Sequence, residues 1–280
     1  NPVNARALQK DLDLRYEDQT LAVYPANLAP HPWPYPFPMD REAGIEAYQA
    51  MITAEEYQAR RARGETGPWD HTYSNDTDSP VLQVVVSKAE QMSPNVTKYE
   101  FTAVDGSDLP EWTAGAHLDI VVAPEFLRQY SMSGDPADRS RYQIGVLRED
   151  EGRGGSKLLH RIFTEGRRVF ISRPINHFPL DESAEKSFLM GGGIGITPMI
   201  AMAHRLHALG KPFELHYSVT DRADAGYLKD LETAPWADQL HLQGSTEGTR
   251  ADLDKVLSGY RSGWHVYTCG PDRYMTAVMA

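Results

Sequence analysis

Near residue 184 the spacing of apolar residues changes, and this change constrains the fold more than any other feature of the sequence. Between residues 80 and 183, short apolar runs are separated by turns rich in Gly, Asp, Ser and Pro. From residue 184 to residue 280, short apolar runs alternate with segments of helical spacing. The first pattern is typical of an antiparallel β-barrel, and the second of a parallel, doubly wound sheet. We therefore expect two domains of different architecture.

The boundaries of the expected elements follow from these patterns. The strands of the barrel domain are expected at Val81–Val86, Thr97–Phe101, His117–Val122 and Tyr142–Val146. The strands of the second domain are expected at Phe188–Met190, Phe213–Val219, Leu240–Leu242 and His265–Thr268. The helices between them are expected at Thr197–Leu209, Tyr227–Leu231 and Ala251–Leu257.

The first 79 residues lack a repeating core pattern. Their proline- and aromatic-rich run, residues 24–38, excludes helix and sheet and favours an extended path. Asp40 can then cap a helix that continues to about Gly64. We expect residues 1–79 to form an irregular and helical extension, either a strap packed on the protein's own surface or an arm that docks a partner.

Composition excludes several classes of function. The formal net charge of −11 makes nonspecific binding to nucleic acid unfavourable. No stretch reaches the roughly 18 consecutive apolar residues of a membrane span, and the N-terminus lacks the apolar core of a signal peptide. We expect a cytoplasmic protein with no nucleic-acid or membrane partner, although Asn1 leaves a processed leader open.

Cysteine and histidine usage argues against a metal site. The chain has one cysteine, Cys269, so it has no intrachain disulfide, no cysteine-ligated iron-sulfur cluster and no four-cysteine zinc site of its own. The ten histidines include no HExxH-type pair. A metal-free chain is the expectation.

Two motifs of the barrel region suit a phosphate. Arg128-Gln129-Tyr130-Ser131, expected at the start of a strand, contains a guanidinium that can donate two parallel hydrogen bonds. In residues 152–156, glycines leave backbone N–H groups accessible, and Ser156 is expected to cap the helix that follows. Taken alone, the first motif also fits an ordinary strand with an exposed arginine, and the second a plain turn.

Two further motifs follow expected strands of the second domain. In residues 191–199, GGGIGITPM, glycines allow a ligand to approach the backbone, and Pro198 suits a first helical turn. This is not the GxGxxG fingerprint, and a tight packing turn is the alternative. Cys269-Gly270-Pro271-Asp272 ends the last expected strand, where ligands gather in open α/β sheets. An inert buried cysteine is the alternative there.

In this order and spacing, the four motifs resemble the ferredoxin-NADP reductase superfamily. RQYSMSGDP, GRGGS, NHFPL and GGIGITPM resemble more specifically the group of the phthalate dioxygenase reductases and vanillate demethylase reductases. The resemblance covers residues 80 to 280. It implies an antiparallel flavin-binding β-barrel followed by a parallel doubly wound NAD-binding domain.

The resemblance also implies two sets of binding residues. The flavin site would contain Arg128, Gln129, Tyr130, Ser131, Gly145, Val146, Gly154, Gly155 and Ser156. The site for the nicotinamide dinucleotide would contain Gly192, Gly193, Gly195, Thr197, Pro198, Asp221, Cys269, Gly270 and Pro271.

The resemblance also implies a role for individual residues. Arg128 would bind the flavin phosphate together with Gly154, Gly155 and Ser156, and Tyr130 would pack against the flavin. Ser131, near the flavin N5, and Cys269, beside the nicotinamide ring, are the expected catalytic residues. Hydride transfer needs no general base, so none is assigned.

The implied activity is that of an NADH reductase. It would pass electrons through FMN to a 2Fe-2S ferredoxin domain or protein, and on to a Rieske-type oxygenase or demethylase. The GRGGS form is typical of FMN in this group. An FAD-containing electron-transfer subunit or flavin reductase of another system is the first alternative, and a non-catalytic regulatory module is the second.

At its C-terminal end, this sequence differs from the members of the group. Its members usually continue into a plant-type ferredoxin domain with four cysteines, whereas this sequence stops at Ala280, within the helix expected after CGP. We expect the NAD-binding domain to be incomplete here, with a separate iron-sulfur protein as the alternative.

The nicotinamide donor is predicted from the end of strand Phe213–Val219. Asp221 can accept hydrogen bonds from a ribose diol and repels a 2′-phosphate, which favours NADH. Arg222 favours NADPH instead, because an arginine can bind the 2′-phosphate. Solvation of both residues in a turn is the third possibility, and NADH is our prediction.

Overall fold

The computed structural model describes residues 59–60, 62–65, 81–123, 126–152, 154–249 and 252–279. The proline-rich run of residues 24–38 lies outside the described residues, as does most of the helix expected over residues 40–64. Of that helix, Ala59, Arg60 and Ala62 are described and are helical. None of the helices in the described ranges is long and apolar enough to cross a membrane.

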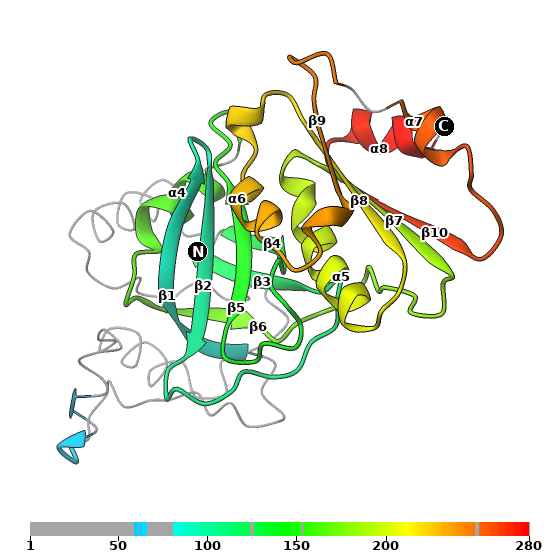
Figure 1. The fold of residues 1–280 in the computed structure, drawn as a ribbon. Coiled ribbons are helices and arrows are strands. Elements are labelled where there is room, and N and C mark those ends of the chain that lie inside the picture. Colours follow the sequence, from blue (N-terminus) through cyan, green and yellow to red (C-terminus); the bar gives the residue numbers. More distant parts are fainter. Residues whose placement is uncertain are drawn as a thin grey trace, which may run out of the picture.

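Within these ranges, six strands form an antiparallel sheet in the order β4-β3-β6-β1-β2-β5. Their bounds are β1 Val81–Ser93, β2 Val96–Ala103, β3 His117–Ala123, β4 Phe126–Ser131, β5 Tyr142–Leu147 and β6 Arg168–Ser172. An isolated bridge between Met132 and Ile144 joins the chain just after β4 to β5. Because β4 and β5 are the two ends of the order, this bridge closes the sheet into a barrel (Figure 1). The antiparallel barrel is confirmed.

Two features of the barrel differ from expectation. The motif that begins at Arg128 ends β4 instead of starting a strand, because Phe126 already pairs with Ala123 of β3. β6 was not expected at all. All five of its residues are buried, so its sequence lacks the alternation that marks a half-exposed strand.

One helix, α4 (Gly155–Ile162), follows the glycines between β5 and β6. Leu158, Leu159 and Ile162 recur at helical spacing and are buried in the same core as the inward-facing residues of the barrel strands. The N-terminus of α4 is thereby held against the barrel.

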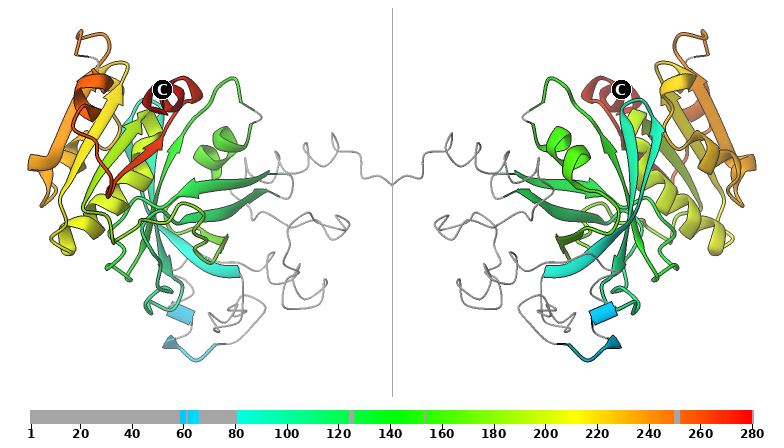
Figure 2. Two further views of the ribbon diagram at one scale, coloured as in Figure 1. Left: turned by 90° about the vertical axis from the view of Figure 1, so that its right-hand side faces the viewer. Right: turned by 90° about the vertical axis from the view of Figure 1, so that its left-hand side faces the viewer.

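Four parallel strands form the second sheet, again within the described ranges, in the order β10-β7-β8-β9. Their bounds are β7 Lys186–Gly192, β8 Phe213–Val219, β9 Leu240–Gly244 and β10 Trp264–Cys269. Figure 2 shows the two sheets as two lobes that lie side by side. The expected parallel sheet is confirmed, with strands up to four residues longer than the sequence pattern indicated.

Helices cover both faces of this sheet, as a doubly wound fold requires. Their bounds are α5 Ile196–Ala208, α6 Leu228–Glu232, α7 Leu253–Leu257 and α8 Asp272–Met279. α5 packs on β7, β8 and β10, and nine of its residues are buried. On the opposite face, α7 and α8 cover Phe188 and Met190 of β7 (Figure 1).

Tyr227, just before α6, joins the two domains. It has a φ of 69° and is the one non-glycine residue with a positive φ among the described residues. Its hydroxyl lies 3.0 Å from the Ser133 Oγ of the barrel domain, and both side chains are buried. A Cβ on Gly145 of β5 would lie 2.7 Å from this hydroxyl oxygen. A glycine in the barrel wall therefore makes room for the ring.

An ion pair close to Tyr227 connects the same two domains. Lys98 Nζ of β2 lies 2.6 Å from Asp230 Oδ2 of α6 and 3.3 Å from Glu90 Oε2 of β1. The Lys98 side chain is only 8% exposed, so its charge is largely removed from water and needs these carboxylates. The pair and the tyrosine together hold α6 on the barrel.

We expect the substitution Tyr227→Phe to destabilise the protein. It keeps the ring but leaves the buried Ser133 hydroxyl without its partner, which costs about 1–3 kcal/mol. Urea denaturation should show a free energy of unfolding lower by that amount. The matched control is Tyr260→Phe, because Tyr260 is 55% exposed. Equal stability of the two variants would contradict the role of this hydrogen bond.

Candidate functional site

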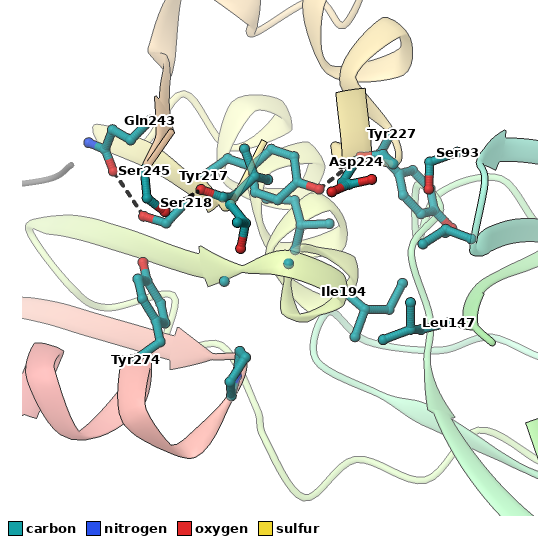
Figure 3. A pocket seen from close by; sticks show the side chains of 18 of the residues that line it. Ser93, Leu147, Ile194, Tyr217, Ser218, Asp224, Tyr227, Gln243, Ser245 and Tyr274 are labelled. Atoms are coloured by element: carbon teal, nitrogen blue, oxygen red, sulfur yellow. Dashed lines mark hydrogen bonds between the residues drawn. The ribbon is translucent and has the colours of Figure 1, made fainter. Parts of the chain in front are cut away.

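A cleft of about 680 Å³ lies at the carboxyl ends of β7, β8 and β9. In open α/β sheets, this edge is where ligands bind. Figure 3 shows Ser218, Gln243 and Tyr274 on the side of the parallel sheet, and Ser93 and Leu147 on the side of the barrel. The cleft is therefore bounded by both domains.

The glycine run after β7 forms one wall of the cleft. A Cβ on Gly192 would lie 2.7 Å from the Tyr274 ring, and one on Gly195 would overlap the Cys269 carbonyl oxygen. These two glycines are required by packing. Gly193 differs, because its φ is +54° and nothing lies within 4 Å of its Cβ position. The run thus combines a packing turn at Gly192 and Gly195 with backbone at Gly193 that borders the cleft.

The last two motifs are in direct contact. Gly270 has a φ of +150°, and a Cβ there would lie 2.8 Å from the Gly192 carbonyl oxygen. Pro271 lines the cleft, as do Gly192 and Gly193. Cys269 is partly buried and is not among the cleft-lining residues. Burial raises the pKa of its thiol, so Cys269 is uncharged at neutral pH.

Thr197 and Pro198 begin α5 and are both buried. The Thr197 hydroxyl donates to the Ile194 carbonyl oxygen at 3.0 Å. The Thr197 methyl carbon lies 2.8 Å from the position of a Gly145 Cβ. Thr197 therefore lies at the junction of the two domains, and its hydroxyl is already bonded within the turn.

The charged groups near the end of β8 bond to residues of the same segment and of α6. Asp221 accepts a hydrogen bond from the Ala223 N–H at 2.9 Å and caps η3 (Arg222–Asp224). Arg222 pairs with Glu232 at 3.1 Å. Neither Asp221 nor Arg222 is among the residues that line the cleft, whereas Asp224 and Arg273 are.

Asp224 and Arg273 were missed in the sequence. Arg273 lies two residues after Pro271 of the CGP motif, so its position could have marked it as a candidate. No sequence signal distinguishes Asp224 from the other acidic residues of this segment, because its exposure to the cleft depends on the turn that Asp221 caps.

In the barrel, the first two motifs meet. A Cβ on Gly155 would lie 2.6 Å from the Arg128 Nε, so the guanidinium lies directly over the first residue of α4. A guanidinium beside a helix N-terminus is a suitable site for a phosphate. The expected capping role of Ser156 was wrong. Gly154, with a φ of 93°, is the N-cap, and the Ser156 Oγ accepts from the Glu149 N–H at 3.1 Å.

The other expected residues of β4 and β5 have different surroundings. Tyr130 is largely buried, and burial raises its pKa to about 12, which keeps the phenol neutral. The Gln129 Nε2 donates to Asp119 Oδ1 of β3 at 2.8 Å, on the opposite side of β4 from Tyr130. Ser131 pairs with His117 at the end of the strand. The Val146 side chain is fully buried in the barrel core, so only its backbone can face a ligand.

No family model matches the chain. The reductase subunit of tert-butanol monooxygenase / tert-amyl alcohol desaturase from Aquincola tertiaricarbonis is 42% identical over 200 residues, which are 70% of this chain and 59% of that protein. The vanillate O-demethylase oxidoreductase of Acinetobacter baylyi is 37% identical over 199 residues, which are 71% of this chain and 62% of that protein.

A solved structure agrees with these relatives. Phthalate dioxygenase reductase, described as a modular structure for electron transfer from pyridine nucleotides to a 2Fe-2S centre, matches with a TM-score of 0.68 and 34% identity. The match covers 71% of this chain and 63% of that one. The chain thus spans between 59% and 63% of the length of these three proteins.

We expect Gly195→Ala to destabilise the junction between α5 and β10. The new Cβ would overlap the Cys269 carbonyl and lie 2.6 Å from the Gly270 nitrogen, and both are backbone atoms that cannot move cheaply. Overpacking of this kind costs about 1–3 kcal/mol. Thermal and urea denaturation measure the loss. The matched control is Gly259→Ala, whose nearest neighbour would be a Trp264 ring carbon at 3.9 Å. If both variants were equally stable, the packing role of Gly195 would be wrong.

Proposed function

We propose that this chain, which belongs to the ferredoxin reductase-type superfamily, is the NADH-oxidising flavin reductase of a Rieske-type oxygenase or demethylase system. Within the superfamily it belongs to the group of the phthalate dioxygenase and vanillate demethylase reductases. The observation that carries the proposal is the cleft at the carboxyl ends of the parallel strands, which the barrel bounds from the other side. Such a cleft suits two ligands that must meet, one held by each domain. The named oxygenase and demethylase reductases among its relatives support the same activity.

The residues at the start of α4 fit the phosphate of FMN. The Arg128 guanidinium lies where a side chain on Gly155 would otherwise be, beside the N-terminus of the helix. Arg128, Gly154, Gly155 and Ser156 would hold the phosphate, and Tyr130 would pack against the ring system. A bound flavin would supply the chemistry that a hydride donor and a one-electron acceptor require, because it exchanges both electron pairs and single electrons.

The cleft residues have complementary tasks. Gly193, with an open backbone, lets a dinucleotide pyrophosphate approach, and Arg273 offers a cation to it. Leu147 of the barrel and Ile194 of the turn after β7 give the cleft apolar surface where the two domains meet, and this surface would limit water between the ligands. The neutral thiol of Cys269 fits a residue that lies beside a nicotinamide ring without attacking it.

The electron acceptor would be a ferredoxin-type iron-sulfur domain or protein. One cysteine in 280 residues cannot ligate a 2Fe-2S cluster with four cysteines, so the cluster would be carried outside these residues. The relative described as transferring electrons from pyridine nucleotides to 2Fe-2S supports this order of carriers.

FMN is the predicted flavin. Arg128→Ala should lose a charge-assisted contact worth about 1.5–3 kcal/mol, or roughly ten- to a hundredfold in FMN affinity, measured by fluorescence titration of the flavin-free protein. Arg141→Ala is the matched control, because this half-exposed barrel arginine pairs with Asp138 at 3.1 Å. The purified protein should be yellow and should bleach when NADH is added. FAD in the supernatant of the heat-denatured protein would overturn the choice of FMN.

NADH is the predicted donor, and the prediction rests on the carboxylates of Asp221 and Asp224. Asp224 lines the cleft, and Asp221 caps the turn that carries it, so we propose that both favour a ribose diol over a 2′-phosphate. Steady-state kinetics should show a higher kcat/KM with NADH than with NADPH. Asp224→Ala should reduce that preference by about tenfold, the value of one charged hydrogen bond, and Asp221→Ala by less.

The control for the donor experiment is Asp238→Ala in η4 (Ala237–Gln239), outside the cleft-lining residues. This variant should keep the wild-type ratio between the donors. A wild-type protein that works better with NADPH would overturn the assignment.

A further inference from the structure

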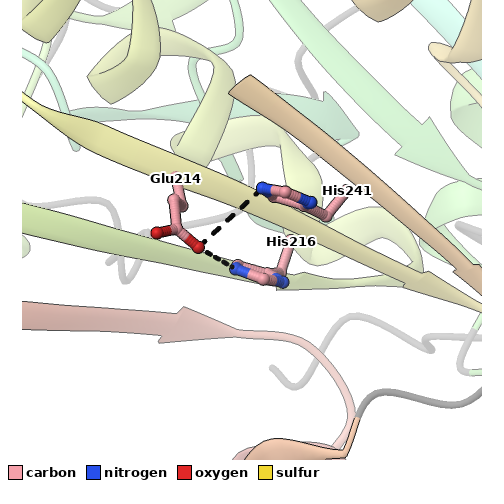
Figure 4. A group of neighbouring side chains, drawn as sticks. All are labelled: Glu214, His216 and His241. Carbon is pink, nitrogen blue, oxygen red and sulfur yellow. Dashed lines mark hydrogen bonds and ion pairs between the residues drawn. The ribbon is translucent and has the colours of Figure 1, made fainter. Parts of the chain in front are cut away.

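Three potential metal ligands converge on the sheet face that lies opposite α5. Glu214 and His216 are two residues apart on β8 and therefore point to the same face. His241 of β9 is the register partner of His216. Figure 4 shows the two imidazole rings and the carboxylate turned toward one another. The ligand atoms of all three lie within 4.8 Å of one another.

The distances between these atoms are near those of a coordination shell. Glu214 Oε2 lies 3.1 Å from His216 Nε2 and 3.8 Å from His241 Nε2. Zinc binds histidine nitrogen and carboxylate oxygen at about 2.0–2.2 Å, and tetrahedral geometry then separates neighbouring ligand atoms by about 3.3 Å. The distances from Glu214 Oε2 to the two histidine nitrogens are therefore within about 0.5 Å of this separation.

Two of the three side chains are also held from behind. Lys186 Nζ donates to the other carboxylate oxygen of Glu214, Oε1, at 2.6 Å. The second ring nitrogen of His216, Nδ1, lies 3.3 Å from the side-chain amide of Gln243. The other end of that amide is 3.0 Å from the Ser218 hydroxyl. Turning the amide by 180° lets its oxygen accept Nδ1–H, which leaves the Nε2 lone pair of His216 free for an ion.

Burial leaves one side of the cluster open. The side chain of His216 is 4% exposed and that of Glu214 is 30% exposed, whereas that of His241 is 49% exposed. The two imidazole rings are stacked, with centroids 4.6 Å apart and planes 16° apart. An ion must lie near the plane of each imidazole, so one ring has to turn. His241, exposed on the edge strand β9, is free to do so.

We propose that Glu214, His216 and His241 form a binding site for one Zn²⁺ ion. Two imidazoles and a carboxylate match the ligand preference of zinc, and water would complete the tetrahedron. An ion here would link the edge strand β9 to the inner strand β8 and so stabilise this side of the parallel sheet. The three ligands do not line the cleft of the proposed reductase activity, although Ser218 and Gln243 behind His216 do.

Isothermal titration with ZnCl₂, on the full chain freed of metal with a chelator, tests the site. We expect one ion per wild-type chain that His241→Gln no longer binds with comparable affinity. The loss should exceed about tenfold, because even changes behind a ligand cost that much. Glu214→Gln should weaken binding in the same way. The matched control is His265→Gln, a histidine of the same sheet whose side chain is 39% exposed, and it should bind like wild type.

Melting temperatures distinguish the loss of zinc binding from misfolding of a variant. In chelator, His241→Gln and His265→Gln should melt at temperatures similar to wild type, and added Zn²⁺ should raise the melting temperature of wild type and His265→Gln only. The proposal is overturned if wild type binds no ion. It is equally overturned if His241→Gln binds Zn²⁺ as tightly as wild type, or if the control variant loses binding to the same extent.

Discussion

The wall of the cleft depends on a close approach between two stretches of backbone, one after β7 and one after β10. Gly195 lies against the Cys269 carbonyl, and Gly270 against the Gly192 carbonyl, so no side chain fits at these positions. This contact ties the start of α5 to the end of β10. It also leaves Gly193 with a left-handed backbone that faces open space, a conformation that favours glycine.

The second constraint acts between the domains. The cleft has one wall on the parallel sheet and another on the barrel, so its shape depends on how the two are fixed. Tyr227 fills the space above Gly145, bonds to Ser133 and keeps a positive φ that costs free energy. Backbone strain of this kind persists only where the surrounding packing maintains it. The Lys98–Asp230 pair anchors α6 to the barrel beside it.

Two cations lie at the phosphate-type positions of an otherwise acidic chain. The chain carries a net charge of −11, yet Arg128 lies at the start of α4 and Arg273 lies in the cleft. Local cations of this kind can attract an anion that the overall negative field of the chain would repel. The neutral state of the Cys269 thiol and of the Tyr130 phenol fits the same picture, since burial disfavours their anions.

Local patterns were sufficient to predict both sheets, most helices and the glycine turns, because periodicity and turn chemistry act over a few residues. The strand Phe213–Val219 was predicted with its observed bounds. β6 was not predicted, because a fully buried strand shows no alternation of apolar and polar residues. The N-cap of α4 was predicted wrongly, because a left-handed turn makes Gly154 the N-cap in place of Ser156.

Contacts between residues that are far apart in the sequence could not be predicted from it. Strand register alone sets His216 beside His241, and the turn capped by Asp221 directs Asp224 to the cleft. These pairings join residues that are far apart along the chain or depend on one turn geometry, so only packing in three dimensions decides them.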